Sequence, residues 1–208
     1  MPIQTEIVLA DDPKSIQRAL EVLQKGGLVA FPTDTVYGLG ALAFDGNAVE
    51  AIFLAKDRPI EKAIPVLIGD EADLEKVSNN ISQIVYKLVS QFWPGPLTVV
   101  VPKKPTLPEA VSEAETVGVR VPDHQVARTL LHSTGPLAVT SANISGQPSP
   151  STAQEVFEQL NGRIELIIDG GKTPGGVPST LVDCTASEIR VLRQGPISLE
   201  QILSAISQ

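Results

Sequence analysis

Short polar segments interrupt this chain at the points where apolar, strand-like runs end. The segment PTDT, residues 32–35, follows LVAF, and TSANISG, residues 140–146, follows LAV. Threonine, serine and asparagine supply hydroxyl and amide groups, and turns of small residues can form anion-binding nests from backbone N–H groups. The same residue types also commonly cap and turn a chain without binding anything. Taken alone, the two segments allow either an anion site or decorated turns.

Cationic side chains stand at similar junctions. Lys56, Arg58 and Lys62 follow the helix-like segment NAVEAIFLA, Arg120 lies between two valines of a strand-like run, and Arg193 follows EIRVL. A solvated helix end, favoured by the helix dipole, explains the first three residues. An ion pair explains a charge inside a strand. Brought together, these cations and their polar neighbours would concentrate positive potential in one cleft for a small polyanion such as a nucleotide.

Alternating helix and strand patterns are expected to position these segments. Apolar residues with helical spacing predict helices over 13–27, 47–56, 80–93, 124–133, 152–160 and 198–206. Continuous apolar runs predict strands over 28–31, 64–68, 97–101, 116–121, 137–141, 164–168, 179–184 and 188–192. This order predicts an α/β fold with a mixed, largely buried sheet, in which ligands settle where strands end.

Composition narrows the class of protein further. The 208 residues, 42% of them hydrophobic and 19% charged, are expected to form one domain over 1–208. A net charge of −8 disfavours a surface built to grip nucleic acid or anionic lipid. The single cysteine, Cys184, excludes an internal disulfide, and two histidines give no zinc-ligand spacing. Because no apolar run is long enough to span a bilayer and no signal-peptide pattern opens the chain, we expect a cytoplasmic protein without a membrane partner.

Eight segments, in order, resemble the YrdC/Sua5 (TsaC) family, the L-threonylcarbamoyladenylate synthases. They are GGLVAFPTDTVYGLG, IFLAKDRP, FWPGPLTVV, VGVRVP, SANISGQPSP, IIDGG, PSTLVD and VLRQGP. The likeness runs from about residue 14 to residue 198 and is to the short form of the family. It implies a single-domain YrdC-like fold, a mixed twisted sheet flanked by helices with a central concave cleft.

The resemblance also implies a reaction. L-threonine, bicarbonate or CO2, and ATP give threonylcarbamoyl-AMP and pyrophosphate, and the product serves N6-threonylcarbamoyladenosine (t6A) formation at adenosine 37 of tRNA. The implied cofactors are ATP, as a substrate, and Mg²⁺ held mainly by the nucleotide phosphates rather than by a metal site of the protein. The product would pass to the tRNA threonylcarbamoyl-transfer proteins, with direct tRNA binding weak or absent.

The family motifs assign roles to ten residues of this sequence. Lys56 and Arg58 are implied as catalytic, and they are expected at the nucleotide with Ser141, Asn143 and Arg193. The residues implied to hold threonine are Thr33, Thr35, Arg120, Thr140 and Ser179. Joining a carbamate to the α-phosphate calls for orientation and charge neutralisation and needs no side-chain nucleophile. The planar fork of Arg120 suits a carboxylate.

Some residues depart from the family pattern, and other functions stay open. Ala63 replaces a familiar proline, which leaves the role of Lys62 open, and Leu67 stands where some relatives have histidine. His124 and His132 are expected on a helix in structural roles. The alternative functions are a carbamoyl-adenylate chemistry, as in hydrogenase maturation proteins, an RNA- or ribosome-binding module of the same fold, and an inactive relative.

Overall fold

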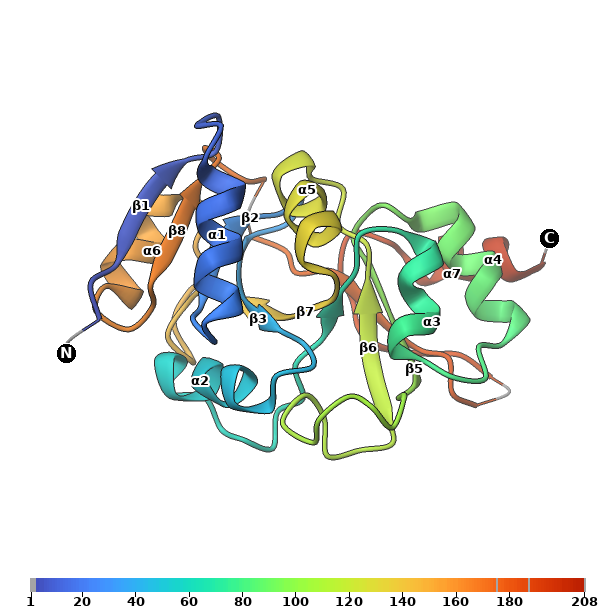
Figure 1. Ribbon diagram of the computed structural model, residues 1–208. Helices are drawn as coiled ribbons and strands as arrows, with labels where there is room; N and C mark the ends of the chain where they lie inside the picture. The colour runs from blue at the N-terminus through green and yellow to red at the C-terminus, as the bar shows by residue number, and fades with distance from the viewer. Residues whose placement is uncertain (1–2, 175, 187, 208) are drawn as a thin grey trace.

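One ten-stranded sheet runs through the molecule (Figure 1). The computed structural model describes residues 3–174, 176–186 and 188–207. The strands pair in the order β1-β8-β2-β3-β7-β4-β6-β5-β9-β10. The sheet contains both parallel pairs, such as β5 with β9, and antiparallel pairs, such as β3 with β7, so the predicted mixed sheet is confirmed. In chain order the strands are β1 Glu6–Leu9, β2 Val29–Pro32, β3 Tyr37–Leu42, β4 Val66–Leu67, β5 Leu97–Pro102, β6 Thr116–Arg120, β7 Leu137–Ser141, β8 Leu166–Asp169, β9 Thr180–Asp183 and β10 Arg190–Arg193.

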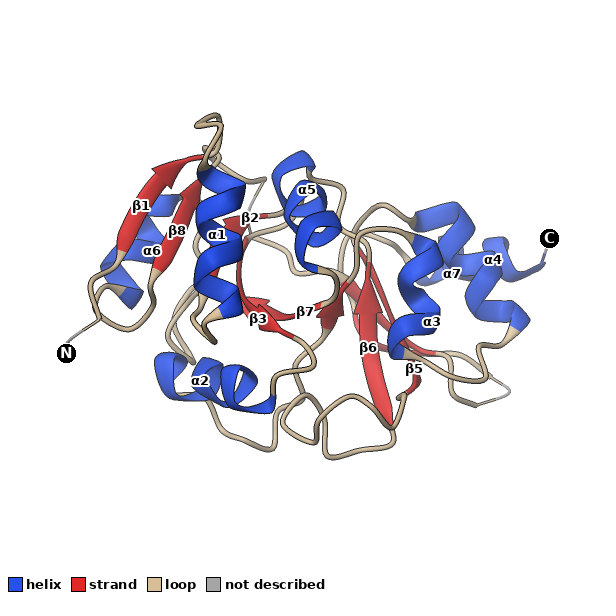
Figure 2. Cartoon of the chain, in the orientation of Figure 1, coloured by secondary structure: helices blue, strands red, loops and turns tan. Residues whose placement is uncertain are grey.

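Helices cover both faces of the sheet. In Figure 2, α1 and α5 lie in front of the strands, and α6 lies behind β1 and β8. The first two pack on each other over a core that includes Leu23, Phe31 and Leu130. A second core, which includes Ile52 and Val156, lies beneath the other helices. The helices are α1 Ser15–Gln24, α2 Gly46–Lys56, the 3-10 turn η1 Glu71–Asp73, α3 Leu74–Val77, α4 Gln83–Phe92, α5 Gln125–Thr134, α6 Ala153–Leu160 and α7 Leu199–Ser207.

Strand β3 was not expected from the sequence, which predicted a turn at PTDT and no strand between residues 31 and 47. The chain turns only between Pro32 and Tyr37 and then runs back along β2. On its other side β3 pairs with β7, where Gly38 lies opposite Ser141. A Cβ on Gly38 would stand 2.7 Å from a methyl group of Val139. The glycines of β3 therefore serve close packing in a strand, and they bring the 33–36 turn beside the end of β7.

There are three smaller differences from the expected elements. Strand β1 at the edge of the sheet was not predicted, although residues 7–10, IVLA, form an apolar run, and its residues alternate between half-buried and exposed. Helix α3 has four residues, too few for a helical periodicity to register. Helix α5 begins at Gln125, so His124 precedes this helix instead of lying in it.

We expect Gly38→Ala to lower the free energy of unfolding by about 1–3 kcal/mol, because the added methyl group overpacks against the stiff, β-branched Val139. Gly46→Ala is the matched control, since a Cβ there meets Pro108 at an ordinary 3.5 Å. Urea unfolding of both variants measures the difference. Equal stabilities would contradict the close-packing role of Gly38.

Candidate functional site

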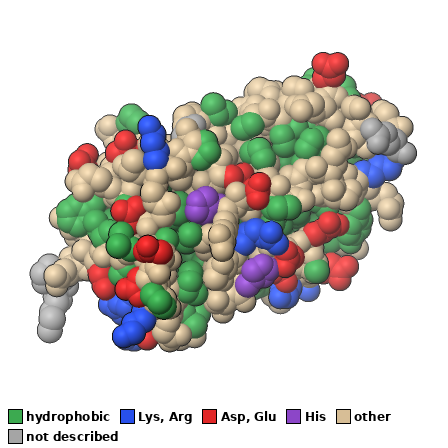
Figure 3. Space-filling view, turned by 90° about the horizontal axis from the view of Figure 1, so that it is seen from above, with side chains coloured by type: hydrophobic (Ala, Val, Ile, Leu, Met, Phe, Trp, Pro, Cys, Tyr) green, Lys and Arg blue, Asp and Glu red, His purple; other side chains and the backbone are tan. Residues whose placement is uncertain are grey.

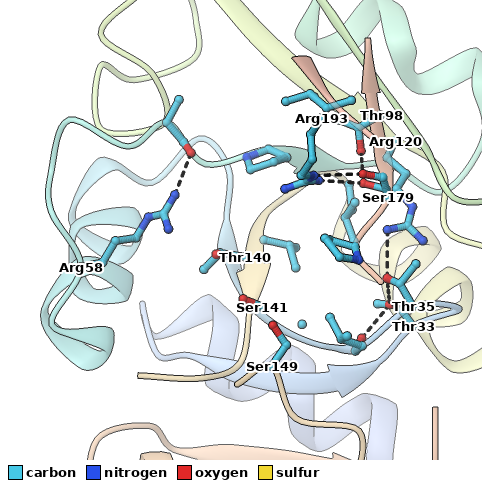
Figure 4. A pocket seen from close by; sticks show the side chains of 18 residues that line it. Thr33, Thr35, Arg58, Thr98, Arg120, Thr140, Ser141, Ser149, Ser179 and Arg193 are labelled. Carbon is cyan, nitrogen blue, oxygen red and sulfur yellow. Dashed lines mark hydrogen bonds between the residues drawn. The ribbon is translucent and has the colours of Figure 1, made fainter. Parts of the chain in front are cut away.

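A cavity of about 360 Å³ gathers residues from widely separated segments of the chain (Figure 4). Its lining comes from the β2–β3 turn, the segment after α2, the central strands β3 to β7, and the chain around β9 and β10. Eight of the ten residues with predicted roles line it: Thr33, Thr35, Arg58, Arg120, Thr140, Ser141, Ser179 and Arg193. The sequence motifs therefore converge in space on one cavity.

The β2–β3 turn presents two buried threonines to this cavity. The Thr33 hydroxyl donates to the Val36 carbonyl oxygen at 2.7 Å and accepts from the Thr35 backbone N–H at 3.2 Å. The two hydroxyl oxygens lie 3.1 Å apart. These local bonds fix the turn, as is typical of Ser and Thr at such positions. In this turn the local-capping interpretation is therefore confirmed, and both residues nevertheless line the cavity.

Arg120, the last residue of β6, is held on three sides. Its Nε donates to the Gly95 carbonyl oxygen at 2.9 Å, its Nη1 donates to the Thr35 hydroxyl at 3.2 Å, and its Nη2 pairs with the Asp34 carboxylate. The side chain is only 7% exposed. Burial lowers the pKa of Arg120, and the charge of Asp34 opposes this effect. Because a guanidinium has five N–H donors, the three tethers leave one donor on each terminal nitrogen. A bidentate pair with a carboxylate takes one donor from each of two nitrogens.

A second group of hydroxyls faces this arginine from β5 and from the residue just before β9. The Thr98 and Ser179 hydroxyl oxygens are 2.7 Å apart. Arg193 reaches over from β10, where its Nε donates to the Ser179 carbonyl oxygen at 3.1 Å and its Nη2 to the Ser179 hydroxyl at 3.2 Å. Figure 4 shows Arg193, Ser179 and Thr98 together on one side of the cavity. Ser179 thus connects the residues predicted to bind threonine with Arg193, which is predicted to bind the nucleotide.

Arg58 approaches from the opposite side of the cavity (Figure 4). Its Nη2 donates to the carbonyl oxygens of Lys62 and Ala63 at 3.2 and 3.0 Å, whereas its Nε is buried without a hydrogen-bond partner among the described residues. Burial lowers the pKa of Arg58. Thr140 and Ser141, at the end of β7, complete the lining between the two sides. The guanidinium therefore retains donors for a ligand.

Lys56 and Asn143 are the two predicted residues that do not line the cavity. Lys56 is 1% exposed, and its ammonium donates to the carbonyl oxygens of Ser141 and Asn143. The Asn143 amide donates to the carbonyl oxygens of Ile144 and Gln147, both at 2.8 Å. Both side chains lie behind the turn that follows β7.

The same turn keeps few backbone N–H groups for the anion-binding nest that its small residues suggested. Four of its backbone N–H groups already donate within the protein: Ala142 to Tyr37, Ile144 to the Gln159 side chain, Ser145 to Lys56 and Gln147 to Ile144. These four N–H groups are therefore not available to an anion.

The cavity is cationic although the chain is acidic overall. Three arginines line it, and no Asp or Glu stands among the described residues of the lining. Walls of protein around a cationic cleft focus its field on an incoming anion. Sequence reasoning missed Thr98 and Ser149, which also line the cavity, and Asp34, which holds Arg120 from behind. A threonine in the apolar run LTVVV carries no signal of its own.

Among the described residues we find neither a cluster of metal ligands nor a helix that could span a membrane. No group of three or more His, Cys, Asp or Glu side chains in residues 3–174, 176–186 and 188–207 is arranged to hold a metal ion. Within the same ranges, none of the helices has the length and apolar character needed to cross a bilayer.

Comparisons with known proteins place this cavity in context. The family model Sua5/YciO/YrdC, described as telomere recombination, matches residues 21–195. A threonylcarbamoyl-AMP synthase of Pyrococcus abyssi is 45% identical over 195 residues, which are 93% of this chain and 57% of that protein. One of Vibrio cholerae is 37% identical over 188 residues, 88% of this chain and 98% of that protein.

A solved structure shares the fold closely. The crystal structure of P. abyssi Sua5 complexed with L-threonine superposes with a TM-score of 0.92 at 43% identity. The match covers 97% of this chain and 60% of that chain. This chain therefore spans less than two thirds of the length of its Pyrococcus relative.

We expect Asp34→Asn to destabilise the fold by about 3 kcal/mol or more, because it leaves the buried Arg120 charge without its counter-ion. Asp57→Asn is the matched control. Asp57 pairs with Arg163 at 2.8 Å, but this pair is 63% and 42% exposed, and removing such a pair costs at most about 1 kcal/mol. Denaturant unfolding of both variants tests the expectation, and equal losses would show that the Asp34 pair is no more important than a surface pair.

Proposed function

Because the chain belongs to the Sua5/YciO/YrdC family, we propose that it is an L-threonylcarbamoyladenylate synthase, a nucleotidyltransferase acting on L-threonine, bicarbonate or CO2, and ATP. The observation that carries the proposal is the convergence of eight motif residues on one cationic cavity. In an acidic chain, such a cavity favours a small polyanion over an extended one.

The threonine end of the cavity is assigned to Thr33, Thr35, Arg120, Thr140 and Ser179. The two free donors of Arg120 would grip the amino-acid carboxylate, and the hydroxyls around them would receive its polar groups. Apolar lining from Leu67 and Val139 borders the same space and suits the threonine methyl group. The similar Pyrococcus structure is a complex with L-threonine, which supports this assignment.

The nucleotide end is assigned to Arg58, Ser141 and Arg193, with Lys56 and Asn143 behind them. In the proposed reaction the threonine nitrogen takes up CO2 as a carbamate and releases a proton. A carbamate oxygen then forms a bond to the α-phosphorus while the bond to pyrophosphate breaks. Because every participant is anionic, cations that hold the groups in line lower the barrier by orientation and by charge neutralisation.

The lining supplies cations and hydroxyls and no described carboxylate, so it does not resemble a metal-ligand set. Mg²⁺ is therefore proposed to arrive bound to the nucleotide phosphates. The roles assigned above to the lining residues do not depend on this ion. Residues 1–208 are proposed to act as one YrdC-like domain in the cytoplasm, where the product would supply the proteins that transfer threonylcarbamoyl to tRNA.

Direct binding of tRNA by this chain is proposed to be weak or absent. Figure 3 shows charged side chains of both signs interspersed over the face seen from above, with no broad basic patch on it. A net charge of −8 points the same way, since neutralisation of phosphates dominates affinity for nucleic acids.

The proposal is tested by mass spectrometry of the purified protein with ATP, L-threonine, bicarbonate and Mg²⁺. We expect threonylcarbamoyl-AMP and pyrophosphate to appear together and to require threonine. A known active synthase serves as the positive control. If that control forms product and this chain forms none, the proposed activity is wrong, and carbamoyl phosphate and tRNA become the ligands to examine.

We expect Arg120→Lys to raise the KM for threonine by about tenfold or more and to change the KM for ATP much less, because an ammonium cannot replace a bidentate fork. Arg18→Lys, which alters a surface pair with Glu6 outside the cavity, is the control. Steady-state pyrophosphate release with each substrate varied in turn measures both constants. Equal losses for the two substrates would remove Arg120 from the threonine end.

A further inference from the structure

Lys56 is a buried cation without a counter-ion. It is the last residue of α2 and is 1% exposed, and its Nζ donates to two backbone carbonyl oxygens, those of Ser141 and Asn143. Among the described residues, no carboxylate pairs with it. Burial lowers the pKa of Lys56 to about 7, and the charge of Arg58 adds to this effect. Burying an ammonium without a counter-ion costs free energy, so we look for a function of Lys56 at this position.

The carbonyl end of the same residue holds the same turn. The Ser145 backbone N–H donates to the Lys56 carbonyl oxygen at 2.8 Å. Lys56 therefore binds the turn after β7 through its side chain and its backbone at once. We call this set, Lys56 with Ser141, Asn143 and Ser145, the Lys56 latch. Two motifs that lie far apart in the sequence form one structural unit through it.

The latch governs a residue that does face the cavity. The Ser141 hydroxyl donates to the Asn143 amide oxygen at 2.5 Å, and Asn143 in turn ties down Ile144 and Gln147. Fixing the Ser141 and Asn143 carbonyls toward Lys56 thus sets where the Ser141 side chain meets the cavity. Without the ammonium, two inward-facing carbonyl oxygens would lose their donor, which favours opening of the turn.

We propose that Lys56 is a positioning residue: its ammonium latches the 141–145 turn to the end of α2 and so presents Ser141 to the nucleotide, which Lys56 itself does not touch. The inference rests on the proposed function for the identity of the ligand. Its structural content, the latch, stands independently of any activity. Arg58, two residues further on, remains the cation of this segment that lines the cavity.

Hydrogen exchange of the ligand-free protein tests the latch. Lys56→Met keeps the apolar stem and removes the ammonium. We expect the hydrogen-bonded amides of residues 142, 144 and 145 to exchange about tenfold faster or more, the effect of losing a hydrogen bond to a charged group. Arg58→Met is the matched control and should leave these amides unchanged. Unchanged exchange in Lys56→Met would overturn the proposal.

A second measurement needs no variant and covers the case in which Lys56→Met does not fold. Acetylation of the wild-type protein at about pH 8 compares Lys56 with the exposed Lys62, since the neutral amine is the reactive form. We expect Lys56 to react at least about tenfold more slowly than Lys62, because the Lys56 amine becomes accessible only when the latch breaks. We expect ATP to change the ratio of the two rates little. Rapid reaction without ATP and protection by ATP would identify a nucleotide contact and overturn the proposal.

Kinetics separate positioning from general instability. We expect Lys56→Met to raise the KM for ATP more than the KM for threonine, because the turn borders the nucleotide end. Equal changes in both constants would overturn the positioning role. If the wild-type protein forms no threonylcarbamoyl-AMP, the proposed function fails, whereas the exchange and acetylation results still decide whether the latch exists.

Discussion

The cavity depends above all on the burial of one guanidinium. Arg120 joins three segments, since it contacts the β2–β3 turn through Thr35 and Asp34 and the chain before β5 through Gly95. A charge with so little exposure is tolerated only when it is paired and hydrogen-bonded. The three hydrogen bonds of Arg120 fix the positions of these segments relative to β6. The groups that hydrogen-bond the buried Arg120 thus also hold this part of the cavity wall in place.

Around this centre the chain separates its charges by location. Acidic residues dominate the composition, yet the lining of the cavity carries three arginines and a ring of hydroxyls. The hydroxyls are small, and they accept or donate according to the ligand, so they match both an amino acid and phosphate oxygens. Such a surface binds by orientation and electrostatics, which is what a transfer between anionic partners needs. No reactive side chain has to be invoked.

The sequence was most informative about which residues meet and least informative about how they are held. Thr33, Arg120, Ser179 and Arg193 could be selected because eight ordered segments resemble one family, since composition and strand patterns alone do not show that these segments meet. The pairing of Asp34 with Arg120 could not, because the two are distant in the chain and Asp34 reads as an ordinary turn residue.

The two cations at the end of α2 show a related limit. Lys56 and Arg58 look equivalent in the sequence, but residues two apart near a helix end do not face the same way, and Asp57 between them is in the left-handed conformation with φ of 50°. Lys56 therefore turns inward while Arg58 reaches the cavity. Strand β3 was missed for a comparable reason, since its glycines are explained only by side chains of the neighbouring strands, Val139 beside Gly38 and Phe31 beside Gly40.

The strand order links the cavity to the folding of the chain. The Thr98–Ser179 contact exists only after β9 has paired in parallel with β5, which lies much earlier in the sequence. The same pairing brings Arg193, which contacts Ser179 beside the β9–β10 pair, to the cavity. Pairings between strands far apart in the sequence form slowly, because the chain loses the conformational entropy of closing a long loop before the compensating contacts are made. A chain that lacks them has Arg58 and Arg120 but only part of the binding surface. A ligand that spans the cavity therefore binds the completed fold alone, and by mass action it stabilises that fold against partly paired states.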